Sequence, residues 1–385
     1  MANLIRMNSK SILGRSTQEI QFALEASTAD GFTPTLAIVF INSEEDVDAA
    51  CSLLKQKNIQ IFGSSAHAPF LDGDASEATI AILLLDLSIQ HFRIELLETI
   101  DSTTFAIAEQ IGKTGLAIFN RPSFLVISGG LTNDGDEIVD GIKKGAGSNV
   151  SLFGGLASDS LQMKRTFVFN NHKLSDSGLI TLILNDEKVE LFGLAYGGWE
   201  PVGNEKIITR SKGNVVYTID DQPALDFIAR YSGINKGELV AASSMAILLS
   251  SNFQLQLQRA NKPPALRTPM YVNDTDGSIV FAGALPEGSR VRLCLLPSFK
   301  VIEITQKEFL EFHKTNPTAD AIIMFSCAGR QGALGQYVNE EINDIKDIWK
   351  VPMAGLFCYG EIGKASGGQS EFLNMTCSLA LLKEK

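Results

Sequence analysis

The feature that most constrains the fold of this chain is a three-part pattern that occurs three times. Each copy has an apolar run, a segment with helical periodicity, and a second apolar run that contains glycine. In the third copy Ile342, Ile345 and Trp349 recur at the spacing of one helix face. The copies cover residues 35–65, 124–160 and 320–363.

Each copy predicts a strand, a helix and a second strand parallel to the first, because a helical crossover joins parallel strands of one sheet. The run at 80–85 is apolar throughout, which is typical of a sheet covered on both faces. Further apolar runs predict antiparallel strands, which we assign to the copy that they follow. These runs are 78–87 and 91–98 after the first copy, 165–171, 178–185 and 189–197 after the second, and 374–382 after the third.

The predicted fold class is therefore α/β, with mixed β-sheets built from repeated strand–helix–strand units and trailing antiparallel hairpins, and with helices packed on the sheets. We predict two domains in the 385 residues. Residues 35–217 would hold the first two repeats, and residues 218–385 the third repeat with inserted hairpins. The insertion begins with a predicted helix that has Pro223 in its first turn and Gly233 as its C-cap.

Charge and composition exclude several classes of partner. The formal net charge is −11 and no stripe of basic residues is present, which argues against binding of nucleic acid or anionic lipid. No apolar run is long enough to insert into a membrane, and the N-terminus lacks the apolar core of a signal peptide. Five cysteines without CxxC or Cys/His ligand spacing argue against a disulfide scaffold or a zinc site. We predict a reduced, cytoplasmic protein without a cofactor.

Several stretches resemble a known family. They are MFSCAGR at 324–330, GLFCYGEIG at 355–363, FLNMTCSLALL at 372–382, FGGLASD at 153–159 and YGGWEPVG at 196–203. Together they are similar to the N- and C-terminal halves of the FIST domain family, over about residues 35–383. The resemblance implies a bacterial sensor of signal transduction that binds small ligands, with amino acids among the candidates.

Two departures from the family pattern affect this expectation. The chain has no room for an attached output module, so a stand-alone member would signal through a separate protein. In the loop GSSAHAPF, at 63–70, Ala68 and Pro69 stand near the place where relatives carry glycine followed by an acid. Whether the N-terminal half contributes to a ligand site is therefore left open.

The strand ends of the third copy hold the candidate site, because ligands of open α/β sheets bind beyond the carboxyl ends of parallel strands. Arg330 would bind a ligand carboxylate through its planar guanidinium, and Glu361 would bind an ammonium group. Glycines at the strand ends would let backbone amides approach the ligand. The predicted ligand-binding residues are Ser326, Cys327, Gly329, Arg330, Tyr359, Gly360, Glu361 and Asn374, with no catalytic or metal-binding residue.

Alternative interpretations of these residues remain at this stage. Arg330 and Glu361 could form an ion pair that closes the strand ends, and Asn374 could cap a turn. Cys327 and Cys358 could be catalytic, either as two thiols that exchange a proton with a substrate carbon or as a nucleophile with Glu361 as base. Both cysteines could also be inert packing residues, since free cysteine is among the most buried residue types.

Overall fold

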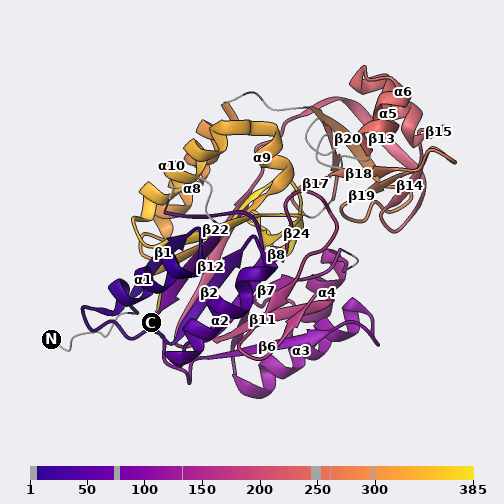
Figure 1. Ribbon diagram of the computed structural model, residues 1–385. Coiled ribbons are helices and arrows are strands. Elements are labelled where there is room, and N and C mark those ends of the chain that lie inside the picture. The colour runs from indigo at the N-terminus through magenta and orange to yellow at the C-terminus, as the bar shows by residue number, and fades with distance from the viewer. Residues whose placement is uncertain are drawn as a thin grey trace.

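The computed structural model describes residues 7–72, 79–131, 133–243, 253–260, 262–295, 298 and 300–385. Within these residues the chain forms helices and four β-sheets, three of them mixed and one antiparallel (Figure 1), which confirms the α/β class. The three mixed sheets share one strand pattern, and each is built around one copy of the repeat.

Each repeat supplies two parallel neighbouring strands at the centre of a sheet, as predicted. These pairs are β2 (Leu36–Ile41) with β3 (Gln60–Ser65), β7 (Pro122–Ser128) with β8 (Leu152–Leu156), and β21 (Ala321–Cys327) with β22 (Met353–Cys358). The connecting helices are α2 (Val47–Gln56), preceded by η1 (Glu44–Asp46); α4 (Gly135–Ala146); and α9 (Ala328–Leu334), η2 (Gly335–Tyr337) and α10 (Val338–Trp349).

On one side of each pair lie two further antiparallel strands. The inner ones are β5 (Ile80–Leu85), β11 (Gly178–Asn185) and β25 (Cys377–Glu384). The outer ones are β1 (Ser9–Gly14), β6 (Phe92–Glu98) and β12 (Val189–Tyr196). Helices α1 (Thr17–Thr28), α3 (Thr104–Ile118) and α8 (Lys300–Thr315) precede the central strands.

The outer strands correct one prediction. Residues 91–98 and 189–197 do form strands, but their assignment to the first and second copies is wrong. β6 is an edge strand of the second sheet, and β12 is an edge strand of the third. Their hydrogen-bond partners, β11 and β25, lie about 80 and 190 residues further along the chain (Leu97 pairs with Leu179, and Val189 with Glu384). Sequence order alone cannot identify such partners.

On the other side of each pair, the sheets exchange strands in a closed cycle. The strand that follows β3 pairs in the third sheet, the strand that follows β8 pairs in the first, and the strand that follows β22 pairs in the second. These strands are β4 (His67–Leu71) beside β22, β9 (Val168–Phe169) beside β3, and β23 (Glu361–Lys364) beside β8. β10 (Leu174–Ser175) and β24 (Ser370–Leu373) complete the first and second sheets.

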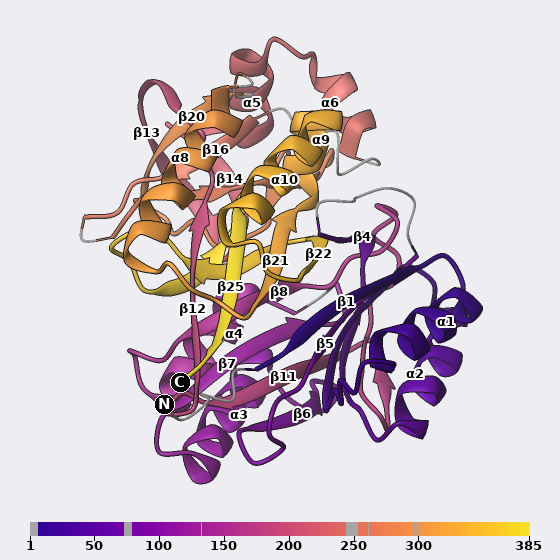
Figure 2. The same cartoon turned by 90° about the vertical axis from the view of Figure 1, so that its left-hand side faces the viewer.

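The inner faces of the three sheets meet in one apolar core, which contains Ile38, Leu125 and Ile323 from the central strands. The alternate residues of the same strands point to the outer face of each sheet and pack against helices. These helices are α1 and α2 on the first sheet, α3 and α4 on the second, and α8 and α10 on the third. Figure 2 shows α1 and α2 along the outer side of the first sheet. Both faces of each sheet are therefore covered, which explains the uniformly apolar strands.

The insertion between β12 and α8 forms the antiparallel sheet with its own apolar core. Its elements gather at the upper right of Figure 1. Gly233 ends helix α5 with a φ of 72°, which confirms the predicted C-cap. The elements are β13 (Pro201–Lys212), β14 (Val215–Ile219), β15 (Gln222–Pro223), α5 (Ala224–Ser232), α6 (Lys236–Ser243), β16 (Phe253–Leu257), β17 (Ala265–Arg267), β18 (Pro269–Val272), β19 (Ile279–Phe281) and β20 (Arg290–Leu295).

Two ion pairs join the inserted sheet to the second sheet and its helix. Arg267 lies 3.3 Å from Asp136 of α4, and Arg259 bonds Glu371 of β24. The predicted domain boundary, between residues 217 and 218, falls within β14. The division into 35–217 and 218–385 stays a prediction.

Candidate functional site

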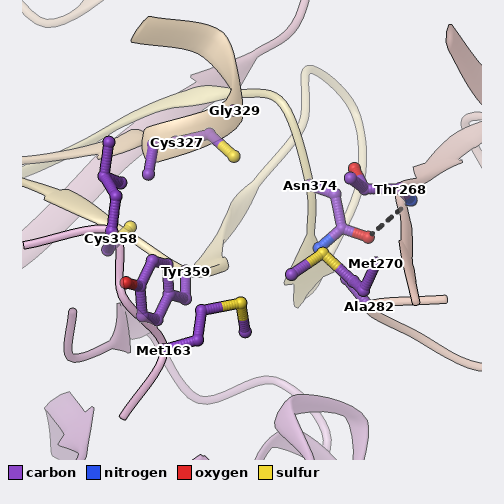
Figure 3. A pocket seen from close by; sticks show the side chains of 11 residues that line it. Met163, Thr268, Met270, Ala282, Cys327, Gly329, Cys358, Tyr359 and Asn374 are labelled. Atoms are coloured by element: carbon purple, nitrogen blue, oxygen red, sulfur yellow. Dashed lines mark hydrogen bonds between the residues drawn. The ribbon is translucent and has the colours of Figure 1, made fainter. Parts of the chain in front are cut away.

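A pocket lies at the carboxyl ends of β21 and β22, where the third repeat faces the inserted sheet. Figure 3 shows Cys327, Cys358, Tyr359 and Met163 on one side, with Thr268, Met270, Ala282 and Asn374 opposite. The lining residues are Leu161, Met163, Thr268, Met270, Ala282, Cys327, Ala328, Gly329, Cys358, Tyr359 and Asn374.

The pocket is narrow and largely apolar. Its cavity volume is about 20 Å³, which is room for about one water molecule. Side chains at its walls must therefore move before a larger molecule can enter. Met163 and Met270 suit this role, because methionine side chains are unbranched and adapt readily to different shapes.

Two buried polar side chains lie together in the wall of the pocket, Thr268 from the insertion and Asn374 from the connection between β24 and β25. Thr268 is 3% exposed, and its Oγ1 has no hydrogen-bond partner among the described residues. Asn374 is 1% exposed; its Nδ2 donates to the carbonyl of Leu373 at 2.9 Å, and its Oδ1 accepts from the backbone N–H of Thr268 at 3.4 Å. Thr268 Oγ1 is therefore a polar group in the pocket wall that lacks a partner within the described part of the chain. A buried hydroxyl without a hydrogen bond costs free energy, which a ligand that bonds it would recover.

The opposite wall includes residues 159–165, which we call the pocket loop. The carboxylate of Asp159 accepts backbone N–H bonds from residues 162–165, at 2.7–3.2 Å. Leu161 and Met163, which line the pocket, have φ angles of 62° and 49°. Left-handed backbone is unfavourable for such residues, so the bonds to Asp159 hold the loop in a strained conformation.

Tyr359 connects this loop to the end of β22, because its hydroxyl donates to the carboxylate of Asp159. Burial raises the pKa of Asp159, but the bonds from Tyr359 and the backbone amides outweigh burial and lower it overall. The Asp159 carboxylate is therefore ionised at neutral pH. Burial and the same carboxylate raise the pKa of Tyr359, which keeps its hydroxyl protonated.

Glu361 lies near the pocket and is fully buried. Its Oε2 accepts from the backbone N–H and Oγ1 of Thr376, at 3.0 and 2.8 Å, and its Oε1 lies 3.5 Å from Cys358 Sγ. Burial raises the pKa of Glu361 to about 7, against the opposing effect of these hydrogen bonds. Its carboxyl group is therefore partly protonated at neutral pH. Cys358 lines the pocket, whereas Glu361 does not.

The two candidate catalytic cysteines line the pocket, but their thiols are poorly suited to nucleophilic chemistry. Burial, followed by the nearby Glu361, raises the pKa of both Cys327 and Cys358. The thiolate is the reactive form of cysteine. Very little of either thiolate exists at neutral pH, so the geometry does not favour cysteine catalysis.

Arg330 corrects the sequence-based expectation, because its guanidinium is buried and bonded within the protein. Nε donates to Glu341 at 2.9 Å, Nη1 donates to the carbonyls of Gly197 and Met375, and Nη2 donates to Thr305 Oγ1 and Glu341. All five N–H groups have acceptors. None is left for a ligand carboxylate, and the alternative pairing of Arg330 with Glu361 is wrong.

The eight predicted residues therefore fall into two groups. Cys327, Gly329, Tyr359 and Asn374 line the pocket, whereas Ser326, Arg330, Gly360 and Glu361 are not among its lining residues. Ser326 is a fully buried strand residue whose Oγ has no partner among the described residues.

Sequence reasoning did not find the residues that other segments bring to the pocket. Leu161 and Met163 come from the pocket loop, which follows the second repeat, so the N-terminal half does contribute to the wall. Thr268, Met270 and Ala282 come from the insertion. The FGGLASD stretch, which ends at Asp159, was the one available signal, and nothing in the sequence marked Thr268.

At the corresponding strand end of the second repeat, the polar groups around Asn133 are hydrogen-bonded to one another within the protein. Asn133 Nδ2 donates to Ser128 Oγ and to the carbonyl of Gly129, at 2.9 and 2.7 Å. Its Oδ1 accepts from the hydroxyls of Thr99 and Thr104, both at 3.2 Å. These polar groups therefore need no ligand, in contrast to Thr268 Oγ1.

Comparison with protein families gives two adjacent matches. Residues 35–222 match the FIST N domain and residues 224–364 match the FIST C domain. No curated protein matches the chain. In the described part of the chain, no helix has the length and apolar character needed to cross a membrane. Nor do the described His, Cys, Asp and Glu residues form a group of three that could hold a metal ion.

Proposed function

The chain belongs to the FIST family of signal-transduction sensor domains, and on that premise we propose that it binds a small metabolite in the pocket at the ends of β21 and β22. The observation that carries the proposal is the unpaired Thr268 hydroxyl, which is 3% exposed and lines this pocket. A ligand that bonds this hydroxyl would satisfy a polar group that the described protein residues leave without a partner.

The position of the pocket supports a sensing role. Its lining comes from three parts of the chain, namely the third repeat with the segment that follows it, the insertion, and the pocket loop after the second repeat. A ligand that touches all three would favour one arrangement of these parts over another, which is the requirement for a ligand-driven change of state. Wider hollows of about 350–470 Å³ lie elsewhere, away from the ends of β21 and β22.

The nature of the ligand needs revision. The sequence-based choice of amino acids depended on Arg330 for the carboxylate and on Glu361 for the ammonium group. Arg330 donates all its N–H groups to protein acceptors, and Glu361 is not among the residues that line the pocket. The support for an amino-acid ligand is accordingly reduced to the family resemblance.

The proposal also states how the protein passes on its signal and in which compartment it acts. We propose a cytoplasmic protein that passes its ligand state to a separate signalling partner. Support for a reducing compartment comes from the cysteines, since all five are free and buried. Cysteine-dependent isomerisation or hydrolysis is the weaker alternative, because the thiols that line the pocket have raised pKa values.

The proposal is tested by thermal unfolding in the presence of amino acids and a broad set of other metabolites, because a ligand of the folded state raises Tm. Thr268→Val should remove most of the shift caused by a true ligand. Thr181→Val is the matched control, since Thr181 of β11 is also fully buried with an unpaired hydroxyl but does not line the pocket. If no metabolite in the set raises Tm in a way that Thr268→Val abolishes, the result would count against the proposal.

A further inference from the structure

We propose that the ligand of this pocket is a neutral molecule, with a small apolar body and one amide-like hydrogen-bonding group. This inference rests on the proposed function and specifies its ligand class. It excludes zwitterionic amino acids, organic anions and amines as the main ligand.

The lining of the pocket is uncharged. Of the described residues that line the pocket, none is an Asp, Glu, Lys, Arg or His. A charged ligand group that entered this narrow space would lose its hydration without gaining a counter-charge, which is unfavourable.

The two buried arginines next to lining residues, Arg267 and Arg330, are already paired with acids. Arg330 follows the lining residue Gly329 and is paired with Glu341, both being no more than 1% exposed. Arg267 precedes Thr268 and lies 3.3 Å from Asp136. Neither guanidinium is available to attract an anion into the pocket.

Two acids near the pocket, Asp159 and Glu361, are already engaged by hydrogen bonds within the protein. The carboxylate of Asp159 accepts four backbone N–H bonds and the hydroxyl of Tyr359. Glu361 accepts two bonds from Thr376, lies 3.5 Å from Cys358 Sγ, and is not among the residues that line the pocket. Neither carboxylate is positioned to pair with a ligand ammonium group.

Two adjacent side chains of the lining, Thr268 and Asn374, complement an amide group. Asn374 Nδ2 has two N–H groups and donates one to Leu373, which leaves one for a ligand carbonyl. Thr268 Oγ1 is unpaired and can accept a ligand N–H. The two residues are neighbours, since the Thr268 N–H donates to Asn374 Oδ1 at 3.4 Å. They therefore offer one donor and one acceptor side by side.

The remaining walls set the apolar part of the ligand. Leu161, Met163, Met270, Ala282 and Ala328 present aliphatic or thioether surface to the pocket. The cavity volume of about 20 Å³ requires these side chains to open for any organic ligand. A ligand with a compact aliphatic body requires the smallest movement of these side chains.

The experiment compares four compounds that share an isobutyl group, namely isovaleramide, isovalerate, isoamylamine and leucine. Binding is measured by saturation-transfer NMR titration of the wild-type chain. We expect isovaleramide to bind at least tenfold more tightly than each of the three charged compounds. Thr268→Val should weaken isovaleramide at least fivefold, whereas Thr181→Val should leave its affinity within twofold.

The outcomes separate this inference from the proposed function. Equal or tighter binding of leucine, isovalerate or isoamylamine overturns the neutral-ligand inference, as does failure of isovaleramide to bind. The sensor function is judged separately by the metabolite set. A charged metabolite whose Tm shift is lost in Thr268→Val would uphold the sensor and overturn the inference, whereas a set without any such ligand would count against the sensor itself.

Discussion

The hydroxyl of Tyr359 donates a hydrogen bond to the carboxylate of Asp159, across 200 residues of sequence. This bond connects the end of β22 in the third sheet to the pocket loop that follows β8 in the second. Because Asp159 also organises the backbone of that loop, the bond determines where Leu161 and Met163 lie over the pocket.

Tyr359→Phe should loosen the pocket loop. The variant removes one hydrogen bond to a charged acceptor, so we expect a loss of about 1–3 kcal/mol in the free energy of unfolding. The backbone at Leu161 and Met163 would then leave its unfavourable left-handed conformation more often. Hydrogen exchange at residues 160–165 should become at least several-fold faster. Tyr271→Phe, at a side chain that is 53% exposed, is the control, and unchanged exchange in Tyr359→Phe would contradict the prediction.

Glu361→Gln should alter the pH dependence of stability. Glu361 has a raised pKa of about 7 in the folded state, against an ordinary value of 4.5. Between these values the folded chain binds more protons than the unfolded chain, so stability falls as pH rises through this range. Glutamine does not titrate and should remove this dependence, which amounts to about 3 kcal/mol.

The Glu361→Gln prediction is checked by urea unfolding of both proteins at pH 4.5 and pH 8. The wild-type chain should lose more stability than the variant between these two pH values. Glu25→Gln, on the exposed side of α1, is the control and should follow the wild type. Parallel pH profiles for the wild type and Glu361→Gln would disprove the predicted pKa shift.

Arg330→Met should be strongly destabilising, because it leaves the carboxylate of Glu341 buried without its partner. We expect a loss of about 3–5 kcal/mol by urea unfolding. The matched surface change is Arg290→Met, since Arg290 pairs with Glu205 while both are largely exposed; it should cost less than about 1 kcal/mol. Adding Glu341→Leu to Arg330→Met should recover part of the loss. Equal losses for both arginine variants would show that the buried pair has no special role.

Cys327 and Cys358 should resist alkylation in the folded protein. Both are buried and have raised thiol pKa values, so the reactive thiolates are scarce. We expect iodoacetamide at pH 7.5 to label them at least a hundredfold more slowly than in urea, as followed by peptide mass spectrometry. Fast labelling of either residue in the native protein would restore the case for cysteine catalysis.

Much of the fold could be predicted because its signals are local. The alternation of apolar runs with helical periodicity identified all three parallel strand pairs, and the C-cap at Gly233 followed from the conformational freedom of glycine. The strand ends at Cys327 and Cys358 followed from the same local pattern, and with them the general position of the pocket.

The partners of individual side chains could not be predicted in this way. Arg330 pairs with Glu341 of α10 rather than with Glu361 or a ligand, because the packing of α9 against α10 and α8 decides which acceptors surround its guanidinium. Leu161, Met163 and Thr268 lie in or beside connections without periodic pattern, so no sequence signal brought them to the pocket.

The sequence by itself therefore determined the three strand–helix–strand units, since hydrophobic periodicity depends on neighbours a few residues apart. The tertiary structure alone decided the cyclic exchange of β4, β9 and β23 among the sheets, the attachment of the insertion and the composition of the pocket. These depend on contacts between residues far apart in the sequence, such as Asp159 with Tyr359, 200 positions apart, and His67 of β4 with Phe357 of β22. Such contacts form only when the whole chain has packed.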